Sequence, residues 1–355
     1  MQNPFTTTFS KAPVHTYIAT DEPREIIENF SYEIPAESVY KITGVRGSGK
    51  TVALVKVEEE LSNDQNRDQG WLVYRLNASR DMLMQFAAHL YKEPFVHEKI
   101  HGRSISLSAS ILGTGGALGL STERSDEIFD LGVEIDEMLK AASAHRKKIL
   151  ISIDEVSKTN EMIRFAGEFG NWLRAGYPVF LVCTGLYENI QELSNVKNLT
   201  FFRRATTVKT GPLNTIRMSE MYRSKLSIDL STAKTLASIT RGYAYAFQEL
   251  GTIYFNKGCE EDITDVAERL RTELFAYSYE KIWEELSQGD RQILRYLTDG
   301  GEHKREEILA LMGNTSGNYS VYRDRLLRRG IIEVRHGYIS LVLPFFGEYI
   351  EEYGT

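Results

Sequence analysis

A glycine-rich run ending in lysine and threonine is the strongest chemical signal in this chain. Residues 44 to 51 read Gly-Val-Arg-Gly-Ser-Gly-Lys-Thr and directly follow a short apolar segment. Glycines let successive backbone N–H groups turn inward, and the start of a following helix adds its own N–H groups, an arrangement that binds phosphate. The alternative is a glycine-rich turn before an ordinary helix. The strand-loop-helix context favours a nucleotide-binding loop formed by Gly44, Val45, Arg46, Gly47, Ser48, Gly49, Lys50 and Thr51.

Within this loop, two side chains have distinct chemical tasks. Lys50 can reach the outer phosphate oxygens of a bound ATP, and the Thr51 hydroxyl can bind Mg²⁺.

Two acids follow a second apolar segment, residues 149–153, which predicts a strand. An apolar strand that ends in Asp-Glu is the Walker B pattern of nucleotide hydrolysis. Asp154 would hold Mg²⁺, and Glu155 would orient or deprotonate the attacking water. The alternative is two solvated acids at a strand end, but the phosphate-binding loop earlier in the chain favours catalysis.

Three more polar residues follow later segments. Thr184 ends the apolar residues 178–183, where its hydroxyl could either sense the γ-phosphate or stabilise a strand-end turn. Arg203 and Arg204 are adjacent, and one of them could reach the phosphate of a neighbouring subunit as an arginine finger. Surface salt bridges are the alternative for both arginines.

The order of apolar and amphipathic segments predicts an α/β fold. Strands are expected near residues 71–74 and 178–185, with helices at 82–91 and 160–174. This alternation favours a P-loop NTPase core, a parallel sheet flanked by helices, over residues 1–213. Residues 214–284 have helical periodicity throughout and predict a helical lid. Within them, Tyr243 and Phe247 have the spacing of core packing.

Residues 285–355 predict a separate winged-helix domain. Three amphipathic segments are separated by glycines, and residues 287–290 can cap the first of them. Two short apolar strands then flank Arg335-His336-Gly337, which predicts a hairpin.

A set of arginines in this last domain suggests duplex DNA as a partner. They are Arg325, Arg328 and Arg329 on the third helix, and Arg335 at the tip of the wing. Arginines at these places would contact phosphates and groove edges. Nearby acids dilute the patch, and winged helices also bind proteins, so a protein partner is the alternative.

The amino-acid composition narrows the class of protein further. The 355 residues carry a net charge of −7, so any DNA contact must come from a local patch. Only two cysteines are present, Cys183 and Cys259, which argues against a disulfide scaffold and against a cysteine zinc site. No segment has the pattern of a signal peptide or a membrane span, which predicts a cytoplasmic protein without a membrane partner.

One segment between the second strand and the acid pair, residues 101–126, stands apart. Residues 104–111 alternate strictly between serine and an apolar residue, and several glycines follow. The pattern predicts an insertion that forms a loose hairpin or a surface loop, which could contact DNA or a neighbouring subunit.

Together these motifs resemble those of the AAA+ and STAND-type P-loop ATPases with a C-terminal winged helix, a group that includes the archaeal replication-initiator-like ATPases. The opening residues 3–9 also look like the start of bacterial ATPases of this kind. Two positions depart from the group's pattern: Ala244 stands where a proline is common, and no arginine directly follows Gly242. The resemblance is carried by Gly44 to Thr51, Ile151 to Glu155, Thr184 to Leu186, Phe202 to Arg204, Gly211 to Leu213 and Gly242 to Ala244.

This resemblance implies ATP and Mg²⁺ as cofactors, an adenine that borders residues 16–24, and a homo-oligomer or a protein partner. We therefore expect a Mg²⁺-dependent ATPase that acts as a nucleotide-controlled switch and binds DNA through its winged helix. The alternative is a signalling or defence-type regulatory ATPase whose winged helix binds a protein.

Overall fold

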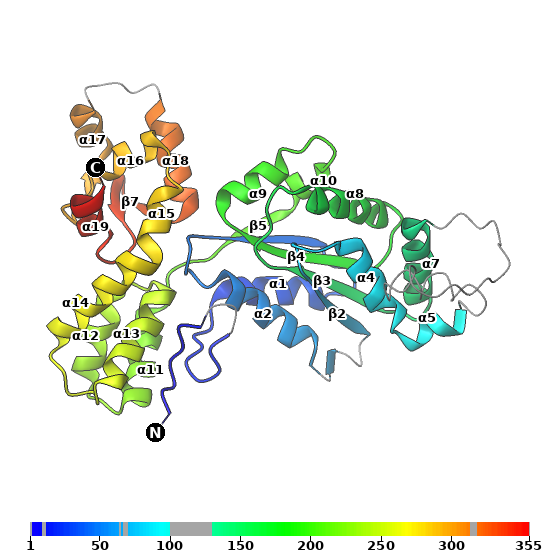
Figure 1. Cartoon of the computed structure of the whole chain (residues 1–355), viewed down its shortest axis with the longest axis horizontal. Helices are drawn as coiled ribbons and strands as arrows, with labels where there is room; N and C mark the ends of the chain where they lie inside the picture. Colours follow the sequence, from blue (N-terminus) through cyan, green and yellow to red (C-terminus); the bar gives the residue numbers. More distant parts are fainter. Residues whose placement is uncertain are drawn as a thin grey trace, which may run out of the picture. The chain divides into compact units, whose positions relative to one another are not determined.

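The computed structural model describes residues 2–8, 12–63, 65–66, 70–99, 130–312 and 318–354 (Figure 1). The predicted insertion at 101–126 lies outside these residues. The chain forms two compact units, which are described separately below. The first unit contains Met1–Arg24, Ile42–Val55 and Val208–Thr355, and the second contains Glu25–Lys41 and Lys56–Thr207. In the part of the chain that the structure describes, no helix is long and apolar enough to cross a membrane.

A five-stranded sheet forms the centre of the α/β fold. Its strand order is β2 (Trp71–Leu76), β3 (Lys148–Ile153), β4 (Val179–Gly185), β1 (Val39–Thr43) and β5 (Thr206–Lys209). β2 pairs with β3, and β3 with β4, in parallel. Parallel neighbours need long crossover connections, which helices provide. The predicted parallel sheet flanked by helices is therefore confirmed.

The second unit packs apolar side chains on both faces of its strands. On one face, Ile149, Ile151 and Ile153 of β3 are fully buried in a cluster with α4 (Met82–Tyr91), α7 (Leu131–Ala144) and α8 (Asn160–Arg174). On the other face, the Phe180 ring lies 5.1 Å from both the Phe30 ring of α1 (Asp21–Ser31) and the Trp71 ring, measured between centroids. This alternation follows from the period of two in a strand.

The bounds of two predicted helices agree with the structure because local signals set them. Asp81 caps α4 by accepting a hydrogen bond from the Met84 N–H, and Thr159 caps α8 by accepting one from the Met162 N–H. Along α8, buried apolar residues recur every three or four positions and form one face. Further helices that the structure describes before β5 are α2 (Lys50–Leu61), α5 (Pro94–Lys99), α9 (Tyr187–Ser194) and α10 (Thr200–Arg204).

The helical part of the first unit covers the range in which helices were predicted (Figure 1). Near the start of the chain, Phe5 packs here, with its ring centroid 5.6 Å from Tyr222 and 5.8 Å from Phe247. Gly251 makes room for the Phe5 ring, since a side chain at this position would clash with it. The elements are α11 (Thr215–Leu226), α12 (Leu230–Ile239), α13 (Ala244–Asn256), α14 (Ile263–Leu274), a turn of π-helix (Phe275–Tyr279) and α15 (Glu280–Glu284).

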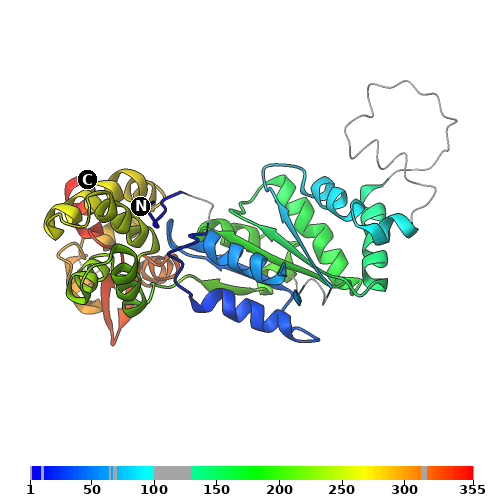
Figure 2. The ribbon, with the colours of Figure 1, turned by 90° about the horizontal axis from the view of Figure 1, so that it is seen from below.

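The C-terminal part of the first unit has the three helices and the hairpin that the sequence predicts. Ser287 and Asp290 form a capping box at the start of its first helix. The hairpin of residues 332–341 is drawn in red in Figure 2. Its two-residue turn at His336 and Gly337 has positive φ at both positions, as a type I′ turn requires. The elements are α16 (Gln288–Leu294), β6 (His303–Lys304), α17 (Arg305–Leu311), α18 (Tyr319–Arg329), β7 (Ile332–Arg335), β8 (Tyr338–Leu341) and α19 (Phe346–Tyr353).

Two features of this part were not predicted. The short β6 pairs with β8, so that the hairpin becomes a three-stranded antiparallel sheet of order β6-β8-β7. The helix α19 follows the hairpin and packs against the π-helical turn. The predicted limits of three domains, at 213/214 and 284/285, stay predictions, because the first unit takes in parts of all three.

Candidate nucleotide-binding site

The predicted phosphate-binding loop connects the end of β1 to the start of α2, which begins at Lys50. Gly47 and Gly49 have φ of 75° and 93°, in the left-handed region that glycine adopts without steric cost. The Lys50 ammonium lies over the loop and donates hydrogen bonds to the carbonyls of Gly44 and Val45, at 3.1 and 3.0 Å. Together these features make the loop and the first turn of α2 a candidate phosphate site.

The base of the loop is held by Thr210, a residue that the sequence analysis did not single out. Its backbone N–H donates to the Thr43 carbonyl at 2.8 Å, and its hydroxyl lies 2.6 Å from the Ser48 hydroxyl. A side chain on Gly44 would clash with the Thr210 hydroxyl. The connection after β5 therefore fixes the loop where it leaves β1.

The start of α13 also contacts the loop. The Tyr243 hydroxyl donates to the Arg46 carbonyl at 2.7 Å, and the Tyr245 N–H donates to the Gly47 carbonyl at 3.1 Å. Tyr243 and Phe247 are both buried in the core of the first unit, as predicted from their spacing. Tyr243 thus has a second task that spacing does not reveal, because its hydroxyl joins the helical part to the loop.

The loop reaches the C-terminal part of the first unit as well. Arg46 forms an ion pair with Glu285 at 3.1 Å. Lys209, the last residue of β5, donates a hydrogen bond to the Leu327 carbonyl of α18. A side chain on Gly330 would lie close to Lys209 and to the backbone of Val45. The loop, the helical part and the C-terminal part of this unit are therefore in direct contact.

In the second unit, the acid pair follows β3. Fully buried Thr184 donates a short hydrogen bond to the Asp154 carboxylate and accepts one from the Glu155 N–H at 3.0 Å. Glu155 is exposed and has a φ of 55°, which is uncommon for a residue with a side chain and marks local strain. Two roles were considered for Thr184. These contacts favour the second role, in which the hydroxyl stabilises the turn at the strand end.

A buried carboxyl group lies near this acid pair and was missed by the sequence analysis. Glu58, in the second half of α2, forms an ion pair with Arg75 at 2.6 Å. Burial raises the pKa of the Glu58 carboxyl, and the Asp154 charge adds to this, whereas Ser152 and Arg75 oppose it. In the sequence Glu58 belongs to a run of three glutamates, so only its position on the buried face of α2 distinguishes it.

Arg203 and Arg204 lie at the end of α10, in a helix rather than an extended segment. Both side chains are exposed. In the isolated chain they therefore have the accessibility that contact with another molecule requires.

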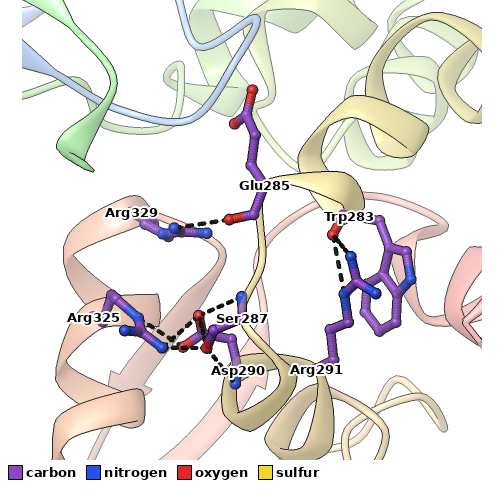
Figure 3. Close-up of polar contacts among 7 residues, drawn as sticks. All are labelled: Trp283, Glu285, Ser287, Asp290, Arg291, Arg325 and Arg329. Carbon is purple, nitrogen blue, oxygen red and sulfur yellow. Dashed lines mark hydrogen bonds and ion pairs between the residues drawn. The ribbon is translucent and has the colours of Figure 1, made fainter. Parts of the chain in front are cut away.

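Two arginines predicted to contact DNA are instead used inside the first unit (Figure 3). Arg325 pairs with the fully buried Asp290 through two of its nitrogens, at 2.9 and 2.7 Å, and also donates to the Ser287 hydroxyl. Arg329 is only 8% exposed and donates to the Glu285 carbonyl at 3.1 Å. Both lie on the side of α18 that faces residues 285–290, so the prediction of DNA contacts needs correction at these two positions.

The other two predicted arginines face outward. Arg328 has 54% of its side chain exposed and pairs with Asp324 at 2.7 Å. Arg335, at the end of β7, has 67% exposed and pairs with Glu333 at 2.8 Å. Exposed pairs of this kind are weak and exchange readily for other partners.

Comparison with solved structures agrees with this architecture. A Walker-type ATPase of Pyrococcus abyssi superposes with a TM-score of 0.58 at 13% identity, covering 93% of this chain and 95% of that one. The ORC2 protein of Aeropyrum pernix, determined as ADPNP and ADP complexes, gives 0.57 at 12% identity, with 98% and 96% covered. The chain therefore shares the fold of these two proteins.

Sequence comparisons add one further match. The profile of a family described as a domain of unknown function, DUF8462, matches residues 276–350, which span the C-terminal part of the first unit. No curated protein matches the chain.

The buried ion pair of Arg325 leads to a prediction about stability. Arg325→Ala should lower the free energy of unfolding by roughly 3 kcal/mol, because it leaves the buried Asp290 carboxylate without its partner. The control Arg328→Ala removes an exposed pair and should cost about 1 kcal/mol or less. Chemical denaturation followed by tryptophan fluorescence measures the free energy of unfolding of both variants. Trp283, just before residues 285–290, is one of the reporting tryptophans. Equal losses for the two variants would contradict the structural role of Arg325.

Proposed function

We propose that this protein is a Mg²⁺-dependent ATPase that transmits its nucleotide state to its C-terminal domain, which we interpret as a winged helix. The observation that carries the proposal is the phosphate-binding loop: its shape is set by two glycines with positive φ, and its carbonyls are held by Lys50, Tyr243 and Tyr245. With these carbonyls engaged, the loop presents backbone N–H groups and a cation to its ligand, which suits a polyphosphate.

The remaining residues have roles that match ATP hydrolysis. The Thr51 hydroxyl and the Asp154 carboxylate are hard oxygen donors of the kind that Mg²⁺ prefers. Mg²⁺ would neutralise charge on the phosphates during transfer. Glu155 would orient the attacking water, and Thr184 would keep both acids in place through its two hydrogen bonds.

Exposed Arg203 and Arg204 are candidates for a finger that one subunit supplies to another. In that case the specific activity should rise with protein concentration. An activity that does not depend on concentration would exclude the finger.

We propose that the binding partner of the C-terminal domain is duplex DNA, bound through Arg328 and Arg335. This rests on the exposure of both side chains on one small domain with a β-hairpin. A regulatory ATPase whose C-terminal domain binds a protein is the second candidate. It is supported by Val321, an apolar residue exposed on α18, and by Leu311, which is exposed on α17.

The assignment of the nucleotide site predicts different outcomes for two variants. Lys50→Ala should abolish ATP binding, because the lysine contacts phosphates in the ground state. Glu155→Gln should keep ATP binding and block hydrolysis, because the glutamate acts only on water. Equilibrium binding of labelled ATP and a phosphate-release assay measure the two properties. A Lys50→Ala protein that binds ATP like the parent would refute the assignment.

The contacts of Thr184 predict a loss of turnover without a loss of binding. Thr184→Val keeps the shape of the side chain but removes both hydrogen bonds to the acid pair, so the hydrolysis rate should fall by about 10²-fold. Thr43→Val is the matched control, since the buried Thr43 hydroxyl has no hydrogen-bond partner among the described residues. It should leave the rate unchanged. Single-turnover hydrolysis compares the two, and equal rates would remove Thr184 from the site.

The proposed DNA contacts predict a change in salt dependence. Arg328→Ala and Arg335→Ala should each lower the slope of log affinity against log salt by about one unit and weaken binding equally across sequences. Arg269→Ala, an exposed arginine on α14, is the control and should change neither. Fluorescence anisotropy with duplex DNA and saturating ATP measures the slopes. An unchanged slope in the double variant would favour the protein partner instead.

A further inference from the structure

A turn of π-helix, Phe275–Tyr279, lies between the helical part and the C-terminal part of the first unit. α14 runs into this turn and α15 follows it directly, without a break in the chain (Figure 1). The Glu280 N–H donates to the Phe275 carbonyl, five residues back, where an α-helix would use Ala276. Such a turn contains one residue more than an α-helical turn. π-turns are rare and are often found at functional sites.

On one side, the phosphate-binding loop holds this turn. The hydroxyls of Tyr243 and Ser278 lie 2.8 Å apart, and both residues are buried. Tyr243 donates its only hydroxyl proton to the Arg46 carbonyl of the loop, so Ser278 is the donor to the Tyr243 oxygen. A chain of hydrogen bonds therefore runs from the turn, through Tyr243, to the loop.

On the other side, the next residue of the turn contacts the C-terminal part of the unit. Fully buried Tyr279 donates a hydrogen bond from its hydroxyl to the Pro344 carbonyl. Its ring centroid lies 4.9 Å from that of Phe346, the first residue of α19. Two adjacent residues, Ser278 and Tyr279, thus connect one turn to the loop and to the C-terminal part.

An α-helical form of the same turn would displace everything that follows it. Moving one residue out of the turn rotates α15 by about 100° and shifts it by about 1.5 Å relative to α14. This rotation would turn the Ser278 hydroxyl away from Tyr243 and break a buried hydrogen bond, which is costly. The π form is therefore favoured as long as the loop holds the Tyr243 hydroxyl in place.

Bound ATP would change the loop at this point. In the structure, the Lys50 ammonium donates to the carbonyls of Gly44 and Val45, which directly precede Arg46. The phosphates of ATP would draw the ammonium group to themselves. The loop, including the Arg46 carbonyl that holds Tyr243, would then lose two of its internal hydrogen bonds and could change shape.

We propose that the π-helical turn of residues 275–279 is the switch element of this protein. When ATP binds at the loop, the hydrogen bond between Ser278 and Tyr243 is lost and the turn converts from π-helix to α-helix. α15 then rotates and moves the C-terminal part with it, because Tyr279 is fixed to Pro344 and Phe346. This inference rests on the proposed binding of ATP at the loop.

Deletion of Tyr277 from the full chain tests this proposal. It removes the additional residue of the turn, and the Tyr277 side chain is 63% exposed, so little core packing is lost. Tyr277→Ala is the matched control, since it removes the same side chain but keeps the number of residues. We would measure the hydrogen–deuterium exchange of α15 with and without saturating ATP and Mg²⁺, and the affinity for ATP by equilibrium binding.

ATP should change the exchange of α15 in the parent and in Tyr277→Ala. The variant that lacks Tyr277 should bind ATP with the parent's affinity, but the exchange of its α15 should not respond, because its turn has no additional residue to lose. A response in the deletion variant equal to that of the parent would overturn the inference.

Ser278→Ala is a second test, which decides the question even if circular dichroism shows that the deletion variant does not fold. The loss of one hydrogen bond should shift the turn toward its α form by about fivefold. Without nucleotide, the exchange of α15 in this variant should therefore approach that of the ATP-bound parent. Ser219→Ala is the control, because buried Ser219 donates within its own helix, to the Thr215 carbonyl at 2.8 Å. Equal exchange of α15 in the two serine variants would refute the switch.

These measurements separate the inference from the proposed function. If the parent binds no ATP, nucleotide binding itself fails, and the inference fails with it. If the parent binds ATP and α18 responds, while the deletion variant responds in α15 like the parent, only the role of the π-helical turn is wrong.

Discussion

The hydrogen bonds that occupy the carbonyl groups of the phosphate-binding loop are the constraint on which the first unit depends. Lys50 holds two of these carbonyls from within, and Tyr243 and Tyr245 hold the next two from the start of α13. A loop built in this way offers its N–H groups to an anion. It also cannot change shape without affecting the helical part, because the same hydrogen bonds define both. The loop and the helical part are therefore parts of one packed structure.

The C-terminal part of the first unit is tied into this structure by charged groups. Glu285 pairs with Arg46 of the loop through its side chain, and its carbonyl accepts from Arg329 of α18. A few residues further on, Asp290 fixes Arg325 of the same helix (Figure 3). A change at the loop would thus reach α18 through residues 285–290. The side of α18 that carries these arginines is used for this connection, which leaves the outward side for a partner.

Much of the fold could be predicted from the sequence because its signals are local. The glycines of the loop, the caps Asp81 and Thr159, and the capping box at Ser287 each act within a few residues, and the corresponding elements begin where predicted. The acid pair was recognised in the same way. The fold class followed from the alternation of apolar and amphipathic segments.

The residues that were missed or misassigned depend on contacts between distant parts of the chain. Thr210 meets Ser48 across more than a hundred residues, and no local pattern marks it. For α18, the periodicity of the sequence predicts the helix but does not show which of its sides packs inward. Arg325 and Arg329 were therefore predicted to contact DNA. Buried Asp290 was recognised only as part of a cap, although it also pairs with Arg325.

We propose that nucleotide bound at the loop changes the C-terminal part of the first unit through residues 285–290. Hydrogen–deuterium exchange of the parent, of Arg46→Ala and of Lys50→Ala, each with and without ATP, tests it most directly. ATP should change the exchange of amides in 285–290 and α18 of the parent. The change should be smaller in Arg46→Ala at an ATP concentration that saturates this variant, and absent in Lys50→Ala. Exchange in α18 that stays the same when the parent is saturated with ATP would contradict the claim.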